Sequence, residues 1–568
     1  MKKPDWPLRT YALVAGVFFL LLAVFVQGIL PLVEPQSRWS KVTKVVRTDY
    51  GEMKWMEHNA TDYTALEMKG RNVYIAEGCW YCHSQYVRPV TGETRRWGPV
   101  TQSGEYAFDR PHLFSTRRIG PDLSRVGLKY SDAWHLAHFW DPRMVVPDSI
   151  MPPFAKLFEG PYKNVRIVDA EGTRTLEKNA TTEKLFDYAS PNQIFLTPNA
   201  DGLLFVPERG KYPVIFTPNN EFEGEAVTLV AATEELRGLV AYVQKLGTNR
   251  GKWRDVFEPQ RLEASLVTIP RSEEWIGFGK QVYERRCVGC HGENGDGNGP
   301  AAAFIQTDRP RNFTLGVFKF RLTPSGSLPT DGDLLRTITR GVRGTAMPTW
   351  HEIPEKDRLA VIQYIKYVLA ADNSDPKKPY LYFVEEPPEP PIYIDKAPPP
   401  SAEIVARGKE EWEKAKCWEC HGKEGKGDGE KAEGLEDDFG FPIPPANLTT
   451  GQFKSGPTAD DIFRTMSTGL SGTPMPSFSD TLSEEELWAI SYYVLSLSAF
   501  TDPLTGEKMN ISEADRAALN DPALTASESH YAYKSSGGSD PSNLFAGDAW
   551  AEKHGIQVIK PAGAQTKE

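Results

Sequence analysis

The chain has 568 residues and a net charge of −11, with 40% hydrophobic and 25% charged residues. This is the composition of an ordinary globular protein, long enough for about three or four domains, and its negative charge argues against nucleic acid as a partner. The 45 prolines indicate connectors and irregular loops rather than one large core.

The first predicted element is a membrane-spanning helix within residues 1–40. Between Tyr11 and Val33 only Gln27 is clearly polar, and about 23 helical residues would extend roughly 34 Å, enough to cross a hydrocarbon core of about 30 Å. The stretch is longer than the apolar region of a cleaved signal peptide, and no small-residue cleavage site follows it. Basic residues before it favour a cytoplasmic N-terminus, although four more between positions 38 and 47 act in the opposite sense.

All six cysteines lie in three copies of one motif, Cys-x-x-Cys-His. The copies read CWYCH from Cys79, CVGCH from Cys287 and CWECH from Cys417. This is the attachment signature of c-type haem: two thiols bond to the vinyl groups of the macrocycle, and the next imidazole reaches the iron from the same side. A structural zinc site needs four ligands, usually from two such pairs, and a thioredoxin-like pair does not require the histidine.

We therefore expect three covalently bound haem c groups. The predicted attachment residues and proximal iron ligands are Cys79, Cys82, His83, Cys287, Cys290, His291, Cys417, Cys420 and His421. Methionine is the expected second ligand, because its thioether raises the potential. Three methionines stand directly before proline, 68, 56 and 54 residues after the haem histidines: Met151, Met347 and Met475. Met144 and Met466 lack the proline and are interpreted as packing residues.

The first copy predicts a cytochrome domain over residues 41–250 with a β-rich insertion at about 156–230. In the insertion, short runs rich in Val, Ile and Phe alternate with turn residues, as in "VRIVDAEGTRTL" and "LLFVPERGKYPVIFTP". His135 and His138 lie three apart on a predicted short helix, "SDAWHLAHFW". No matching carboxylate or cysteine is close in sequence, so we expect them at the surface or supporting other ligands.

The second and third copies resemble each other beyond the haem motif. "PRNFT" matches "PANLT", and "DLLRTITRGVRGTAMPTW" matches "DIFRTMSTGLSGTPMPSF". An amphipathic helix follows each run, which predicts two mainly helical domains over 265–372 and 401–500. The proline-rich segment 373–400 between them is expected to be stiff and extended, and such a linker can lie along a neighbouring surface. The polar tail 501–568 carries no readable motif, so disorder, or ordering only against a partner, is expected.

The first copy resembles the mono-haem, membrane-anchored subunit II of cbb3-type cytochrome c oxidases. The resemblance is carried by "CHSQYVRP", "GPDLSRVG", "DPRMVVPDSIMP" and the later helix "TEELRGLVAYVQKLGT", in this order. The second and third copies each place the haem motif between a first and a last helix and so resemble the class I cytochrome c fold. The expected fold is therefore mainly α, with one transmembrane helix and three class I-like domains. In that family a proline carbonyl often accepts a hydrogen bond from the haem histidine, a role that would fall to Pro121, Pro310 and Pro445. Two fused C-terminal haem domains depart from the oxidase family, in which the second cytochrome subunit is a separate chain.

The resemblance implies an electron-transfer subunit, with a haem–copper catalytic subunit as partner and a soluble or membrane-bound electron donor. It also implies a single-pass protein of the inner membrane with its bulk on the periplasmic side. No general base, nucleophile or open metal site is evident, so no catalytic centre of its own is expected. Two alternatives stay open: a nitric oxide reductase or another haem–copper complex as partner, and a haem peroxidase-like enzyme, against which three Met-Pro candidates argue. We expect the first domain to dock on the catalytic subunit, and the other two to extend outward from it.

Overall fold

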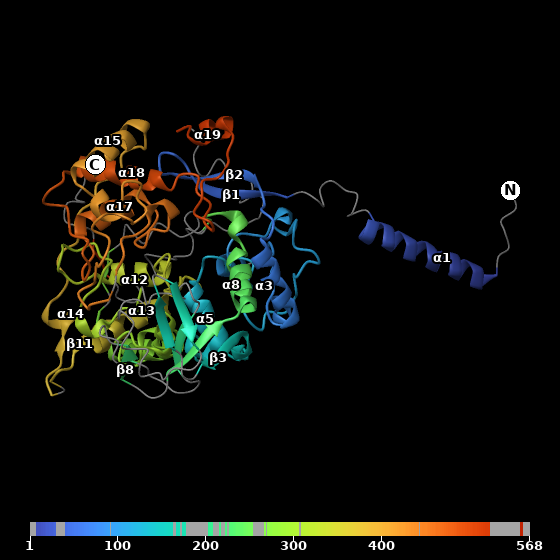
Figure 1. The fold of residues 1–568 in the computed structure, drawn as a ribbon, viewed down its shortest axis with the longest axis horizontal. Helices are drawn as coiled ribbons and strands as arrows, with labels where there is room; N and C mark the ends of the chain where they lie inside the picture. Colours follow the sequence, from blue (N-terminus) through green and yellow to red (C-terminus); the bar gives the residue numbers. More distant parts are fainter. Residues whose placement is uncertain are drawn as a thin grey trace.

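The chain begins with one N-terminal helix, which is followed by a body that contains three helical units (Figure 1). The computed structural model describes residues 7–29, 40–162 except 91–92, 166–170, 173–177, 203–207, 215–216, 222–223, 227–253, 266–268, 270–522 except 306–307, 376 and 442, and 557–559. The units are called first, second and third in chain order. The domain limits given above for them stay a prediction.

The N-terminal helix α1 (Leu8–Ala23) continues into a π-helical turn, η1 (Val24–Ile29). Residues Leu8–Val26 have a mean hydropathy of 2.2 over 19 residues, and none of this stretch is buried against the rest of the chain. Figure 1 shows α1 projecting away from the body. By length and composition this helix can cross a membrane, as the sequence predicts.

Each unit is built on one crossing of its first and last helices. The pairs are α3 (Ala65–Ala76) with α8 (Glu234–Lys245), α10 (Glu273–Arg286) with α13 (Glu355–Tyr364), and α15 (Ala402–Lys414) with α18 (Glu484–Leu497). At each crossing a glycine meets backbone at a small residue of the other helix, where a Cβ would overlap it: Gly70 at Gly238, Gly279 at Ala360 and Gly408 at Ala489. The crossing therefore requires a glycine at the same place in all three units.

Four residues after each of these positions, aromatic side chains complete the contact. Ring centroids lie 5.3 Å apart for Tyr74 and Tyr242, 5.4 Å for Tyr283 and Tyr364, and 5.7 Å for Trp412 and Tyr493. Residues four apart share one face of a helix, so the glycine and the aromatic residue form one packing surface. The first unit thus shares the helical frame of the other two, although its loops differ.

A third helix precedes the methionine loop in each unit: α5 (Asp132–Trp140), α12 (Asp331–Arg340) and α17 (Ala459–Thr468). Thr330 with Asp333, and Thr458 with Asp461, form capping boxes that satisfy the free amides at the starts of α12 and α17. Gly341, at a φ of +68°, ends α12, and the corresponding glycine ends α17. Local sequence therefore sets both ends of these helices.

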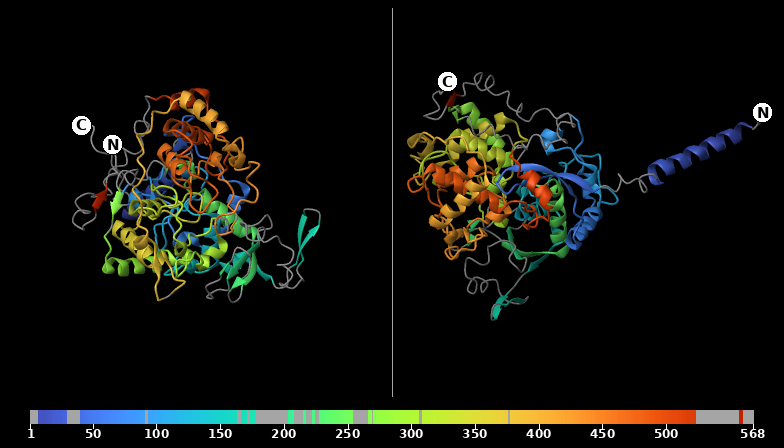
Figure 2. Two further views of the ribbon diagram at one scale, coloured as in Figure 1. Left: turned by 90° about the vertical axis from the view of Figure 1, so that its left-hand side faces the viewer. Right: turned by 90° about the horizontal axis from the view of Figure 1, so that it is seen from above.

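The predicted β-rich insertion contains strands. β3 (Phe158–Tyr162), β9 (Val227–Ala232) and β6 (Leu203–Pro207) form an antiparallel sheet in the order β3-β9-β6. Two hairpins accompany it: β4 (Arg166–Ala170) with β5 (Thr173–Glu177), and β7 (Ile215–Phe216) with β8 (Phe222–Glu223). Strands of this segment project from the body in Figure 2. The rest of the expected insertion lies outside the described residues.

The first residues of the C-terminal tail pack on a β-hairpin near the N-terminus. β1 (Lys41–Arg47) and β2 (Met53–Asn59) pair antiparallel. Helix α19 (Glu513–Leu519) packs on them through a small core formed by Val46, Met56, Ala499, Phe500 and Leu519. The expectation of a disordered or partner-dependent tail is therefore wrong for residues 501–522, because their partner is the first unit of the same chain. Beyond residue 522 only β13 (Gln557–Ile559) is described, and it pairs with β10 (Leu266–Thr268).

The proline-rich connector follows the surface of the units it joins. It begins with a short hairpin of β11 (Ala371–Asp372) and β12 (Tyr380–Leu381), followed by α14 (Tyr382–Glu385). Phe383 is buried in the core of the second unit. Further on, the Ile392 amide donates to the Leu322 carbonyl at 2.8 Å, and the Tyr492 hydroxyl donates to the Pro398 carbonyl at 2.6 Å. The connector is thus extended, as predicted, and anchored at both ends.

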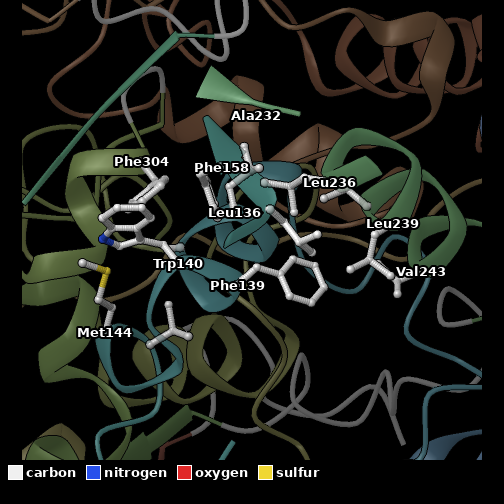
Figure 3. Packing of buried hydrophobic residues seen from close by; sticks show 14 of the residues in the cluster. Leu136, Phe139, Trp140, Met144, Phe158, Ala232, Leu236, Leu239, Val243 and Phe304 are labelled. Carbon is white, nitrogen blue, oxygen red and sulfur yellow. The ribbon is translucent and has the colours of Figure 1, made fainter. Parts of the chain in front are cut away.

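The three units pack against one another in a closed group. Figure 3 shows Phe304, from η10 (Pro300–Phe304) of the second unit, beside Trp140 and Phe158 of the first, in one apolar cluster. The third unit returns to the first, where the Arg47 guanidinium donates to the Pro457 carbonyl at 3.0 Å. The second and third units therefore do not continue in a line away from the first, whereas docking of the first unit on the catalytic subunit and an electron path outward to a donor stay predictions.

Candidate haem sites

Each Cys-x-x-Cys-His motif forms a short helical turn directly after the first helix of its unit. The turns are η3 (Cys79–Tyr81), α11 (Val288–His291) and α16 (Trp418–His421). In each, the histidine amide donates to the carbonyl of the first cysteine at 3.0 Å. Residues four apart lie on one face of such a turn, so the first thiol and the imidazole face the same side. The predicted attachment residues are therefore brought together in all three units.

The six thiols are free and show no disulfide. Burial raises the pKa of Cys79, Cys287 and Cys290 to about 12 and that of Cys417 to about 11. A protonated, buried thiol is a poor redox nucleophile. Burial thus favours the protonated form of these four thiols, in contrast to the lowered pKa of a thioredoxin-like pair.

Each motif histidine is oriented by a backbone carbonyl from a later loop. The Nδ1 of His83 lies 2.8 Å from the Pro121 oxygen, that of His291 lies 3.0 Å from the Arg311 oxygen, and that of His421 lies 3.2 Å from the Ala446 oxygen. A carbonyl only accepts, so Nδ1 carries the proton and the lone pair of Nε2 is left for a metal. Burial lowers the pKa of all three imidazoles, to about 4 for His291. The rings are therefore neutral and ready to ligate.

Only one of the three predicted proline carbonyls holds a histidine. Pro121 does so, whereas in the other units the acceptor is the next residue. The carbonyls of Pro310 and Pro445 instead meet Gly297 and Gly427, both at a φ of +80°, where a Cβ would crowd them. The glycine-rich runs after these two motifs position the prolines one residue away from the predicted role.

The three methionine loops share a support that sequence reasoning missed. Each methionine amide donates to the hydroxyl two residues before it: Met151 to Ser149 at 3.3 Å, Met347 to Thr345 at 3.1 Å and Met475 to Thr473 at 3.2 Å. All three methionines are half-buried. A Ser or Thr at the second position before Met-Pro in every copy was the available signal. That these methionines ligate iron stays a prediction.

The rival methionines lie in apolar cores. Met144 is fully buried in the core of the first unit and Met466 in that of the third. Both positions match packing residues, as predicted.

His135 is buried and His138 is half-buried, so neither is exposed at the surface, and a role in supporting other ligands stays a prediction. Desolvation lowers the pKa of both to about 3, and the Nε2 of His135 and Nδ1 of His138 find no hydrogen-bond partner among the described residues. His138 stacks on Trp134 with ring centroids 4.7 Å apart, and its proximity to His83 further disfavours its charged form. No group of three or more His, Cys, Asp or Glu suited to a metal occurs in the part of the chain that the structure describes.

A polar frame behind the first motif explains why its sequence runs occur together. Asp122 accepts from the Ser84 hydroxyl at 2.6 Å and from the Tyr86 amide at 2.9 Å. Arg118 donates to Glu93 at 2.7 Å and to the Ser84 hydroxyl at the same distance. Burial alone would raise the pKa of Glu93, but hydrogen bonds from Arg118 and Arg88 outweigh it and lower the pKa to about 2. "CHSQ" and "GPDLSR" are thus two halves of one network around His83.

The residues in all three units fit haem c: two thiols, a neutral imidazole with Nε2 available, and a supported methionine loop. The family model "Cytochrome C oxidase, mono-heme subunit/FixO" matches residues 41–250. The model "Cytochrome C oxidase, cbb3-type, subunit III" matches residues 278–365 and again 403–494.

No curated protein matches the chain. Among solved structures, a chain of the Kuenenia stuttgartiensis reducing HAO-like protein complex is 43% identical, with 40% of this chain and 99% of that chain covered, at a TM-score of 0.37. Residues 41–250 thus belong to the mono-heme subunit family of cbb3-type cytochrome c oxidases, and two c-type cytochrome domains of the subunit III family follow in the same polypeptide.

Proposed function

We propose that this protein is a tri-haem, membrane-anchored cytochrome that transfers electrons to the haem–copper catalytic subunit of a cbb3-type terminal oxidase. Helix α1 spans the inner membrane, and the three units lie on the periplasmic side, where a soluble or membrane-bound donor reaches them. Support comes from the two family matches. Both families are cytochrome subunits of cbb3-type cytochrome c oxidases, and here both match the same chain.

The repeated construction of the three sites carries the proposal. In each unit, the same helical turn presents two thiols and an imidazole, a carbonyl holds Nδ1, and a hydroxyl supports the methionine loop. A single such arrangement could be fortuitous, but three with the same contacts point to one cofactor type at each site.

When bound, haem c supplies one-electron exchange between ferric and ferrous iron. The chain keeps each imidazole neutral and in one orientation, and it offers a thioether on a loop fixed by its own hydrogen bonds. Fixed ligands need little rearrangement when the charge on the iron changes. The polypeptide thereby favours electron transfer over reactions that require an open position on the iron.

The surface around the first site supports docking of a protein partner there. Three large apolar side chains stand in the segments that form this site, and each is more than half exposed: Tyr81 at 56%, Ile119 at 57% and Ile150 at 77%. In the second unit the position of Tyr81 is taken by Gly289, which packs on the backbone of Met144. The position of Ile150 is taken by Ala346, which is buried. Exposed apolar patches on a soluble body commonly mark protein contacts. The first site is therefore the better candidate for contact with the catalytic subunit.

The test is to purify the full chain with its native partners, to count haems and to identify the partner subunits. We expect a mass three haem units above that of the polypeptide, with haem retained after denaturation. A C417A/C420A variant should carry two. A wild-type count of two or fewer would refute the tri-haem proposal, and co-purification with a nitric oxide-reducing subunit instead of an oxygen-reducing one would refute the proposed partner.

Carbon monoxide tests the peroxidase-like alternative on the same sample. Three six-coordinate haems should bind little carbon monoxide in the reduced protein. Stoichiometric binding to any of them would show an open iron position and would favour catalysis at that site.

A further inference from the structure

Residues of all three units line a partly open cavity of about 690 Å³. Lys129 and Lys252 reach it from the first unit, Arg340, Arg343 and Met347 from the second, and Ala446, Gly451 and Lys454 from the third. The cavity thus borders the methionine loop of the second site and Ala446, whose carbonyl holds the imidazole of the third site. Any charge placed here lies between two candidate haem sites.

Most basic groups around this cavity have an acidic partner. Lys129 pairs with Glu352 at 3.0 Å, and Arg340 lies 3.4 Å from the Asp461 carboxylate. Lys454 pairs with Asp308. Each of these groups thus has an acidic partner, although Asp461 is shared by Arg336, Arg340 and Arg464.

Lys252 differs from these residues. Its Nζ has less than 1 Å² of accessible surface and no hydrogen-bond partner among the described residues. Its backbone amide donates to the Val45 carbonyl at 3.3 Å, which fixes where the side chain starts. The ammonium lies against Gly451, where a Cβ would overlap it, and Gly451 has a φ of +68°. The fold therefore reserves a place for this side chain.

The surroundings of Lys252 are positively charged. Burial first, and then Arg47, Lys508 and Arg343, hold the pKa of Lys252 well below its usual value, and Asp502 only partly opposes this shift. Asp502 is already paired with Lys44 at 2.8 Å. An amine buried in this way gives up its proton unless an anion pairs with it, so a bound anion is what would hold Lys252 in its charged form.

We propose that the cavity is a binding site for an oxyanion, of the carboxylate, sulfate or phosphate class, and that Lys252 is its principal ligand. The anion completes the polar contacts of Lys252 and neutralises the excess positive charge where the three units meet. Two sources share this chemistry: a carboxylate carried by a bound haem, which rests on the proposed function, and a free oxyanion, which does not.

The test uses the full-length, haem-loaded protein in detergent, as wild type and as K252M. K280M, on the exposed face of α10, is the matched control, and K252Q provides an uncharged variant that keeps a donor. Haem content, the midpoint potential of each haem and the thermal unfolding temperature are measured at constant ionic strength, while sulfate or phosphate replaces chloride. Haem content reports separately on the tri-haem proposal.

If a haem carboxylate is the occupant, K252M and K252Q lower the midpoint potential of one haem in every buffer, because loss of a positive charge favours ferric iron. If the occupant is a free oxyanion, sulfate or phosphate raises the unfolding temperature of the wild type and of K280M in a saturable manner, and both Lys252 variants lose that rise. Either result supports the site. Unchanged potentials together with no anion dependence in the wild type would overturn it.

Discussion

The second unit contacts its two neighbours in opposite ways. Towards the first unit it presents apolar side chains: Phe304 packs into the core that holds Trp140 and Met144. Towards the third unit it presents charge: Asp461, completely buried, lies 3.4 Å from Arg336 and from Arg340 of the second unit. The interface with the first unit is therefore mainly apolar, with one ion pair between Lys129 and Glu352, whereas the interface with the third unit contains a buried charge cluster. The sequence alone predicts only three comparable domains.

The physical consequences of the two interfaces differ. When the neighbour across an apolar interface is removed, the loss in stability follows the apolar area that becomes exposed. The exposed patch also favours aggregation. A buried carboxylate surrounded by arginines contributes little net stability when complete, yet removal of one partner leaves uncompensated charge at a large cost. The first and second units should therefore behave as one folding body, and the third as a copy docked by complementary charge.

Truncation should separate the two cases most strongly. A chain ending at residue 253 keeps the first unit but loses Phe304 and the α19 segment that covers β1 and β2. A chain ending at residue 372 loses α19 as well, but retains the apolar interface. We expect the shorter chain to lose cooperative thermal unfolding, and the longer one to keep it at a reduced temperature. Equal unfolding of the two would show that the first unit folds without the second.

Asp461→Asn tests the ionic interface, and Asp333→Asn in the second unit is its matched control. Both aspartates close capping boxes with a threonine and lie near Arg336. Only Asp461 also pairs with Arg464 of its own helix, at 2.5 Å, and with Arg340 across the interface, at 3.4 Å. We expect D461N to lower the free energy of unfolding by about 3–5 kcal/mol and D333N by about 1 kcal/mol, measured by urea titration. Equal losses would mean that Asp461 acts only as a helix cap.

Sequence reasoning was reliable where chemistry is local. The attachment motifs, the helices around them and the strands of the insertion depend on residues close in the chain, and the structure contains them. The hairpin β1–β2 was missed for a physical reason: Lys44, Arg47 and Lys54 are almost fully buried in it, although charged residues usually indicate an exposed face.

The burial of these charges depends on partners far away in sequence. Asp502 pairs with Lys44, and the Asp521 carbonyl accepts from Lys54 at 2.9 Å. Both belong to a tail that looked unstructured in isolation. Contacts between units, which decide the closed arrangement and the cavity beside Lys252, leave no periodic pattern in a single sequence. Contacts within each unit did leave a pattern. A glycine followed four residues later by an aromatic residue precedes each haem motif, and this repeat could have shown that all three units use the same helix crossing.

Phe304→Ala measures the apolar interface without removing a unit. Phe304 is 2% exposed, so truncation of its ring leaves a cavity between the first and second units. We expect a loss of about 3 kcal/mol in the free energy of unfolding. Leu315→Ala is the control, because Leu315 belongs to the same unit but is 41% exposed, and it should change stability by less than about 0.5 kcal/mol. A loss for F304A as small as that of L315A would show that the shared cluster contributes little.

The attachment of α19 should give the smallest effect and a pH-dependent one. Arg516 donates to both carboxylate oxygens of Asp49, at 2.6 and 2.5 Å, and Asn520 adds a third bond at 2.6 Å. Burial alone would raise the pKa of Asp49, but these hydrogen bonds outweigh it and hold the pKa below its usual value. Because the folded pKa is the lower one, the stabilisation is present above the unfolded value of about 3.9 and is lost as the pH falls through the folded value.

Arg516→Ala should therefore cost about 1 kcal/mol or less at neutral pH, since Arg516 is more than half exposed and solvent screens the pair. The difference from the wild type should shrink as the pH falls below about 4, because protonation of Asp49 removes the same interaction. Arg271→Ala, which breaks a pair between exposed side chains of Arg271 and Glu273, should show neither the loss nor the pH dependence. The measurement is the thermal unfolding temperature of the wild type, R516A and R271A, taken at a series of pH values from neutral down to the pH at which the protein unfolds. A difference between R516A and wild type that stays constant over this range would mean that the ion pair between Arg516 and Asp49 does not hold α19, and that its apolar core and the contacts of Lys44 and Lys54 do.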